Sequence, residues 1–166
     1  MASITLGGTP TKTNGNLPEV GNKAPNFTLR RSDLSKTTLE DYKGKTLILN
    51  IFPSIATGVC ATSVRNFNQK ASALENTQVL CISKDLPFAH ESFCATEGIK
   101  NTLNLSDLSG AFGEDYQVKI IDGAFEDLLS RAIVVIDTAG NIAYTEQVSE
   151  IGNEPNYEAA INAASL

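Results

Sequence analysis

The residues able to do covalent or redox chemistry are few in this chain: three cysteines, Cys60, Cys81 and Cys94, and one histidine, His90. Cys60 follows the apolar run KTLILNIF and the turn PSIATGV, where the helical pattern of residues 59–74 begins. A strand that leads through a turn into a helix places the first helical residues at the carboxyl edge of the sheet, where open α/β folds hold their sites. Free N–H groups and the helix dipole favour a thiolate there. Cys60 is therefore the first candidate nucleophile.

A helix terminus alone activates a thiol only modestly. It contributes about 0.3 to 1 kcal/mol, which corresponds to less than about one pKa unit. A strongly reactive Cys60 therefore needs a cation, and Arg131 is the best placed of the four arginines. Arg131 opens the strand pattern RAIVVID, and if that strand runs antiparallel to residues 45–52, its first residue lies beside Cys60. The alternative interpretation of Arg131 is a solvated charge at the end of a strand.

The cysteine count argues against a permanent disulfide framework. Three is an odd number and the chain shows no export signal, so any disulfide is expected to be transient. A zinc site is the competing use, because His90 and Cys94 lie four residues apart on one predicted helix. A closed zinc site needs four good ligands, however, and the chain has no C-x-x-C. We therefore predict no metal and no cofactor, and we expect Cys81, within QVLCISK, to be a small buried hydrophobe.

Length and composition are typical of a globular protein. The chain has 166 residues, of which 42% are hydrophobic, and this predicts a single domain over residues 1–166. The formal net charge is −6 and no basic cluster is longer than Arg30-Arg31, so nucleic acid is not an expected partner. No apolar stretch approaches the length of a membrane span, and the first residues lack the pattern of a signal peptide. We expect a cytoplasmic protein.

Strand and helix patterns alternate along the chain after an opening hairpin within residues 1–17. Strands are expected at 27–30, 45–52, 77–83 and 102–107, a second hairpin at 130–137 and 141–148, and helices at 59–74, 88–98 and 155–165. This order predicts an α/β fold: a thioredoxin-like three-layer sandwich with a mixed central sheet and an added N-terminal β-hairpin.

Pro53, Thr57 and Cys60 form the pattern P-x-x-x-T-x-x-C, which resembles the active-site pattern of the peroxiredoxins. The segments NIFPS, VCATSVR, VLCIS, DLPFA and FC..EGI look like the thiol peroxidase branch, whose members are atypical two-cysteine peroxiredoxins. The resemblance spans nearly the whole chain. It implies a homodimer with a thioredoxin fold that reduces hydrogen peroxide or alkyl hydroperoxides and is recycled by thioredoxin.

The same resemblance implies a role for five residues. Cys60 matches the peroxidatic cysteine, which attacks the peroxide O–O bond as a thiolate and becomes a sulfenic acid. Cys94 matches the resolving cysteine, which forms the redox-active Cys60–Cys94 disulfide. Thr57 matches the residue whose hydroxyl binds the sulfur and the peroxide, and Pro53 matches the one that shields the pocket. Arg131 matches the arginine that stabilises the thiolate and the developing oxygen charge.

Ala56 departs from the family pattern S-x-D-T, which has an aspartate at this position. A carboxylate there would tie down the turn, so the change bears on loop rigidity and rate rather than on the nucleophile. The Cys60–Cys94 disulfide also requires the helix over 88–98 to unwind, because packed helices seldom bring two Cα atoms within about 7 Å.

A non-enzymatic redox sensor and a thiol–disulfide exchange protein on the same fold are the alternative functions. An exchange protein of the thioredoxin kind would carry C-x-x-C, and this chain has Thr57 in place of the first sulfur. A cysteine hydrolase needs a base beside its nucleophile, and the one histidine lies in the segment of Cys94. Only a peroxidase would consume peroxide continuously with thioredoxin, thioredoxin reductase and NADPH.

Overall fold

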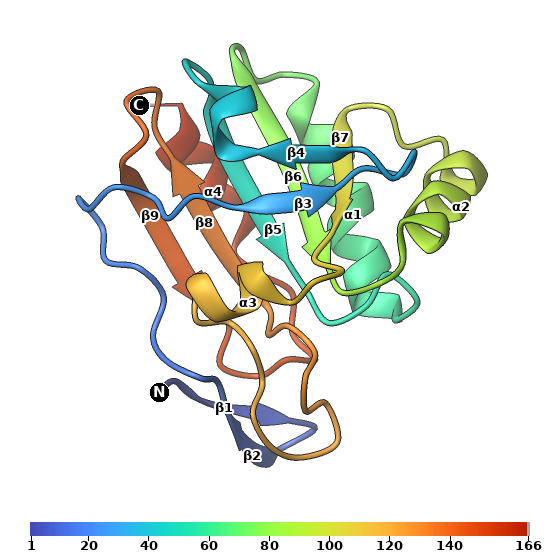
Figure 1. The fold of residues 1–166 in the computed structure, drawn as a ribbon, viewed down its shortest axis with the longest axis vertical. Coiled ribbons are helices and arrows are strands. Elements are labelled where there is room, and N and C mark those ends of the chain that lie inside the picture. Colours follow the sequence, from blue (N-terminus) through green and yellow to red (C-terminus); the bar gives the residue numbers. More distant parts are fainter. Residues whose placement is uncertain (166) are drawn as a thin grey trace.

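A mixed seven-stranded sheet forms the centre of the molecule, with the strand order β4-β3-β7-β6-β5-β8-β9 (Figure 1). The computed structural model describes residues 1–165, so Leu166, the last residue of the predicted domain, lies outside the described residues. The strands are β3 (Thr28–Arg30), β4 (Lys36–Thr38), β5 (Thr46–Ile51), β6 (Thr77–Ser83), β7 (Thr102–Ser106), β8 (Ala132–Ile136) and β9 (Ile142–Gln147). β6 is parallel to β5 and β7, whereas β8 is antiparallel to β5 and β9.

The sheet is buried on both faces, as the continuous apolar run of β5 requires. Leu47, Leu49 and Ile51 point into one hydrophobic cluster, whereas Ile48 and the following Phe52 point into the other. This is the alternation of side chains along a strand. The two clusters separate three layers, which confirms the predicted thioredoxin-like sandwich.

Helices α1 (Gly58–Ala71), α2 (Pro87–Glu97) and α4 (Tyr157–Ala164) contribute to one outer layer. In Figure 1, α1 and α4 lie behind the sheet, whereas the short helix α3 (Ala111–Asp115) and the β3–β4 hairpin lie in front of its central strands. α2 packs at the β7 side. Among residues 1–165, no helix has the length and apolar character that crossing a membrane requires.

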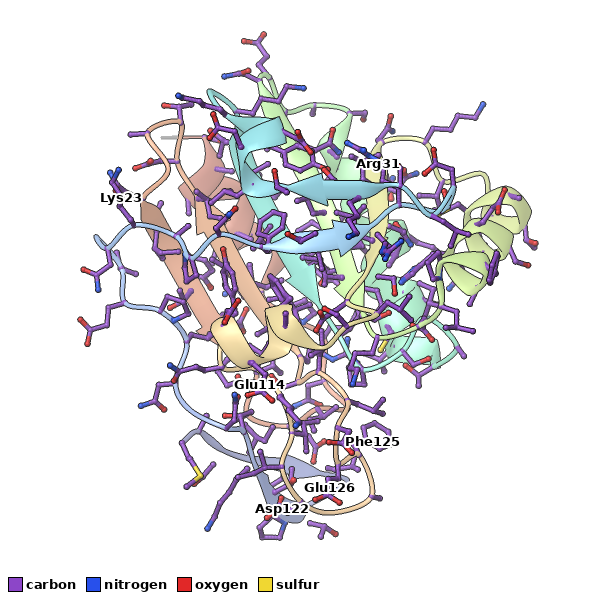
Figure 2. The ribbon with its side chains drawn as sticks, viewed as in Figure 1. Lys23, Arg31, Glu114, Asp122, Phe125 and Glu126 are labelled. Atoms are coloured by element: carbon purple, nitrogen blue, oxygen red, sulfur yellow. The ribbon has the colours of Figure 1, made fainter. Side chains whose placement is uncertain are left out.

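The predicted N-terminal hairpin is confirmed as a separate two-stranded sheet of β1 (Ser3–Leu6) and β2 (Thr9–Lys12). Gly7 and Gly8 both have positive φ angles, of 58° and 83°, which a two-residue hairpin turn of this kind needs. Thr11 Oγ1 donates a hydrogen bond to the carboxylate of Asp122, and Ile4 belongs to a small apolar cluster that Phe125 contacts (Figure 2). These contacts hold the hairpin against the segment that precedes β8.

Two features differ from the sequence-based prediction. The last helix begins at Tyr157 rather than at Pro155, because Asn156 is its N-cap and accepts a hydrogen bond from the Ala159 N–H at 3.0 Å. The strand β4, the 3-10 helix η1 (Leu39–Tyr42) and α3 were not predicted. They span only three, four and five residues, so no periodic pattern can mark them.

Candidate functional site

Cys60 lies in the first turn of α1, as predicted, and is fully buried. The helix begins at Gly58, and Thr57 before it has an extended backbone with φ −89° and ψ 150°. The Thr57 side chain does not cap the helix. The first N–H groups of α1 therefore have no partner within the helix and remain available to negative charge beside the sulfur.

Arg131 is in direct contact with this thiol. β8 is antiparallel to β5, with Ala132 opposite Ile51, so the residue just before β8 lies beside the end of β5. From there the Nη2 group donates a hydrogen bond to Cys60 Sγ at 3.2 Å. The Nε group donates to the carbonyl of Ile151 at 2.7 Å, which fixes the plane of the guanidinium. The interpretation of Arg131 as a solvated strand-end charge is therefore wrong.

Burial strengthens the electrostatic interaction between the Arg131 guanidinium and the Cys60 sulfur. Arg131 is 2% exposed, and no carboxylate within residues 1–165 forms a salt bridge with it. The guanidinium charge therefore has the Cys60 sulfur as its near partner, and a neighbouring cation favours the thiolate form of a cysteine. The second amino group, Nη1, is buried and has no hydrogen-bond partner among the described residues. It is a free donor in the immediate surroundings of the sulfur.

Pro53 and Thr57 lie in the loop between β5 and α1, the first buried and the second half-buried. The Thr57 hydroxyl donates to the carbonyl of Ser54 at 3.1 Å. Its single proton is therefore not directed at Cys60, which differs from the hydrogen bond to sulfur that the resemblance implies. Binding of the Thr57 proton to a ligand oxygen requires rotation of the hydroxyl away from this carbonyl.

Asp85 holds the same loop from a different part of the chain. It follows β6, and its carboxylate accepts hydrogen bonds from Ser54 Oγ at 2.8 Å and from the Ile55 N–H at 2.7 Å. Ala56 is exposed, and its N–H donates to Ser54 Oγ at 3.1 Å. The Asp85 carboxylate thus holds the turn in place, although position 56 has no carboxylate. Asp85 was not singled out from the sequence; its place directly after a strand parallel to β5 was the available signal.

The other two cysteines have different surroundings. All three thiols are free; Cys94 is half-buried in α2, where burial raises the pKa of its thiol. Cys81 is fully buried in β6, as predicted, and burial raises its pKa to about 12. Its sulfur accepts a hydrogen bond from the uncharged Asn50 side-chain amide at 3.6 Å. Among residues 1–165, neither of these two sulfurs accepts a hydrogen bond from a lysine or arginine, whereas Cys60 accepts one from Arg131.

A model of the family described as Redoxin matches residues 19–161 of this chain. The chain belongs to the Redoxin family. The thiol peroxidase of Mycobacterium tuberculosis is 55% identical over 98% of each chain, and that of Corynebacterium glutamicum is 48% identical over 98% of this chain and 99% of the relative. Among solved structures, a peroxiredoxin-like protein from Aquifex aeolicus aligns with a TM-score of 0.94 and 34% identity, covering 99% of this chain and 96% of the other. The resemblance to the thiol peroxidase branch of the peroxiredoxins is confirmed.

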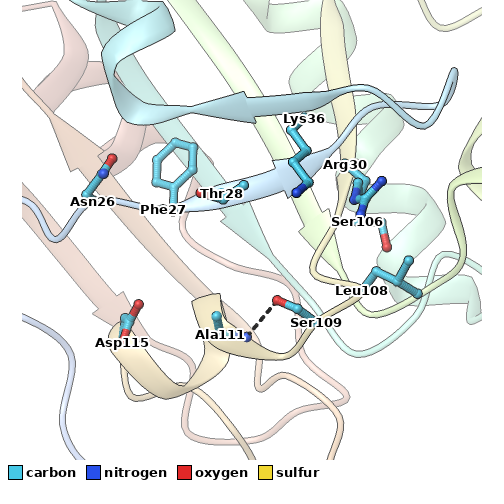
Figure 3. Close-up of a pocket in the computed structure, with 10 residues that line it drawn as sticks. All are labelled: Asn26, Phe27, Thr28, Arg30, Lys36, Ser106, Leu108, Ser109, Ala111 and Asp115. Carbon is cyan, nitrogen blue, oxygen red and sulfur yellow. Dashed lines mark hydrogen bonds between the residues drawn. The ribbon is translucent and has the colours of Figure 1, made fainter.

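A cleft of this Redoxin-family chain is separate from the cysteine site. It is a cleft of about 590 Å³ between β3 and the segment of α3, lined in part by Arg30, Lys36 and Asp115 (Figure 3). Neither Cys60 nor Arg131 lines it. Within residues 1–165, no three His, Cys, Asp or Glu side chains are grouped so that they could hold a metal ion.

Proposed function

We propose that this chain is a thiol peroxidase that reduces hydrogen peroxide and alkyl hydroperoxides, with Cys60 as the peroxidatic cysteine. The observation that carries this assignment is the 3.2 Å contact between Arg131 Nη2 and Cys60 Sγ in the first turn of α1. Membership of the thiol peroxidase branch supports the same reaction. A non-enzymatic sensor is not favoured, because that membership points to catalytic turnover.

In the first half-reaction, the Cys60 thiolate attacks one oxygen of the hydroperoxide. A sulfur–oxygen bond forms as the oxygen–oxygen bond breaks, the leaving alkoxide or hydroxide takes a proton, and Cys60 becomes a sulfenic acid. The buried Nη1 group of Arg131, which has no partner among the described residues, is available to the oxygen that becomes negative. Thr57 turns its hydroxyl toward the peroxide, and Pro53 keeps water away from the sulfur.

In the second half-reaction, the Cys94 thiolate attacks the sulfenic sulfur of Cys60. The sulfur–oxygen bond breaks as the disulfide forms within the chain, and the hydroxide leaves as water with the proton that the Cys94 thiol gave up. Cys94 belongs to α2, which is short and bounded by Pro87 at its start and Gly98 at its end, so it can unwind locally. Thioredoxin then reduces the exposed disulfide by thiol–disulfide exchange and restores both thiols.

The test is peroxide consumption coupled to NADPH oxidation through thioredoxin and thioredoxin reductase. We expect the natural chain to turn over continuously and Cys94→Ser to be oxidised once and then to stop. Peptide mapping of the peroxide-treated natural chain should identify the Cys60–Cys94 disulfide. A Cys60–Cys81 bridge, a link between two chains, or sustained turnover of the Cys94→Ser variant with thioredoxin would contradict the assignment.

We further propose a homodimer in the cytoplasm. The transient disulfide needs a reducing compartment in which thioredoxin is present, which supports the cytoplasm. Leu86 and Phe88, at the start of α2, are 54% and 59% exposed and offer apolar surface for a second copy. Sedimentation equilibrium of the reduced chain tests the assembly: a purely monomeric chain at micromolar concentration would contradict it.

A further inference from the structure

A chain of hydrogen bonds runs from α2 to the loop before Cys60. His90, in the first part of α2, is 1% exposed, and its Nε2 atom lies 3.0 Å from Ser83 Oγ. Ser83 Oγ is bonded in turn to the carboxylate of Asp85. That carboxylate is the group that holds the Ser54 hydroxyl and the Ile55 N–H. The helix that carries Cys94 is thus joined to the loop that shapes the Cys60 site.

The direction of each bond follows from the protons available. The Asp85 carboxylate can only accept, so Ser83 must donate its one hydroxyl proton to it. Ser83 Oγ can then only accept from His90, which therefore carries its proton on Nε2. The Asp85 N–H also donates to Ser83 Oγ, at 3.2 Å. Every bond of the chain is consistent with a neutral His90.

The surroundings of His90 disfavour its charged form. The ring of Phe52, just after β5, packs at a centroid distance of 6.4 Å, and His90 Nδ1 is buried with no hydrogen-bond partner among the described residues. Asp85 is the charged group whose field reaches the ring, and it favours the charged form. Burial is the larger effect and lowers the pKa of His90 to about 4.

We propose that His90 is a positioning residue that couples the resolving helix α2 to the peroxidatic loop through Ser83 and Asp85. The inference rests on the proposed role of Cys94 for its meaning in catalysis. In the reduced protein the three side chains hold the loop and the first turns of α2 in one arrangement. When α2 unwinds so that Cys94 can reach Cys60, the contact between His90 and Ser83 is broken and the loop is released as well.

The coupling makes the opening of α2 depend on pH. An unwound α2 exposes His90 to water and returns its pKa toward the ordinary value of about 6.5. Between pH 6.5 and 4 the open form therefore binds a proton that the closed form does not, so acid favours opening. Above pH 6.5 both forms are neutral and pH has no effect through this group. From pH 7.5 to pH 5.5 the open fraction should rise about tenfold.

Hydrogen exchange of the reduced protein, without peroxide, tests the coupling. The protection of amides 88–98, expressed relative to the intrinsic exchange rate at each pH, should fall about tenfold from pH 7.5 to pH 5.5 in the natural chain. His90→Gln keeps a side-chain N–H for Ser83 but does not titrate, so its protection should be the same at both pH values. The amides of α4 serve as the internal reference.

His90→Leu, which cannot donate to Ser83, should also lower the protection of the Ile55 and Ala56 amides, and His90→Gln should restore it. Equal pH dependence of α2 in the natural chain and in His90→Gln would overturn the proposal. So would unchanged loop protection in His90→Leu. Because no peroxide or thioredoxin is present, failure here leaves the peroxidase assignment intact, and failure of the coupled assay leaves this result intact.

Discussion

Cys60 and Cys81 are two thiols of the same hydrophobic cluster, both with no exposed surface, yet their surroundings are chemically opposite. Cys60 has the guanidinium of Arg131 at 3.2 Å and the first turn of a helix around it. Cys81 has an uncharged side-chain amide at 3.6 Å, and burial raises its pKa to about 12. Burial alone makes a thiol inert, whereas burial beside an otherwise unpaired cation makes it a nucleophile.

Position in the sheet explains the difference. Cys81 lies in the middle of β6 between β5 and β7, with the uncharged residues Asn50 and Asn104 as its neighbours in register. Cys60 lies just beyond the end of β5, where the loop, α1 and the start of β8 converge. Only such an edge can bring a helix terminus and an arginine from another strand to one sulfur.

Replacing each of these two cysteines with serine should give the largest difference in activity. Cys60→Ser should reduce peroxide turnover by at least about 10⁴-fold, the scale of removing a catalytic nucleophile. Cys81→Ser should retain turnover within about threefold, because the hydroxyl fits the same site and no reacting group is lost. The coupled assay measures the rates, and thermal melting verifies that both variants fold. An inactive Cys81→Ser with an active Cys60→Ser would reverse the assignment.

Removal of the cation should make Cys60 resemble Cys81. Arg131→Met should slow peroxide attack by about 10² to 10³-fold, because a preorganised charge beside the reacting sulfur is lost. It should also cost about 1 to 3 kcal/mol of folding stability, since the Ile151 carbonyl loses its buried donor. The alkylation rate of Cys60 at neutral pH should fall as well. An unchanged alkylation rate and a normal peroxidase rate would show that Arg131 does not act on Cys60.

Alkaline pH should lower the folding stability through the buried thiol of Cys81. Its pKa is raised to about 12 in the folded protein, above the ordinary thiol value, so the folded state is stabilised below pH 9 and loses this contribution as pH rises toward 12. At pH 11 the loss should reach about 2.7 kcal/mol in the natural chain. Denaturant unfolding at pH 8 and pH 11 measures it, and Cys81→Ser is the matched control. The same pH dependence in both proteins would contradict the burial effect.

Changes in the loop should have the smallest effects. Asp85→Ala removes the acceptor of the Ile55 N–H and should slow peroxide attack by about tenfold, because the loop no longer fixes the first turn of α1. Ala56→Asp should change the rate by less than about twofold, since Ala56 is exposed and Asp85 already holds the turn. Single-turnover oxidation rates compare the two. A larger effect at position 56 than at 85 would mean that Asp85 does not hold the loop.

The parts of the structure that were predictable from the sequence are those that local sequence patterns determine. The helical period after Val59, the apolar run of β5 and the Gly7-Gly8 turn each specify an element within a few residues. The neighbourhood of Arg131 followed from one further assumption, the antiparallel pairing of β8 with β5.

The parts that were not predictable depend on contacts between distant segments or on single torsion angles. The bonds from Asp85 to Ser54 and Ile55 cross about thirty positions of sequence and join two loops whose own sequences show no sign of pairing. The direction of the Thr57 hydroxyl depends on one side-chain torsion angle, which residue spacing does not specify.

Trapping of the sulfenic acid identifies the reacting sulfur most directly. Reduced Cys94→Ser is treated with one equivalent of hydrogen peroxide in the presence of dimedone, and the labelled peptides are mapped by mass spectrometry. We expect the label on Cys60, none on Cys81, and a much slower appearance when Arg131→Met is added to the same chain. A label on Cys81, an unlabelled Cys60, or a labelling rate unaffected by Arg131→Met would contradict the conclusion that the buried cation turns Cys60 into the nucleophile.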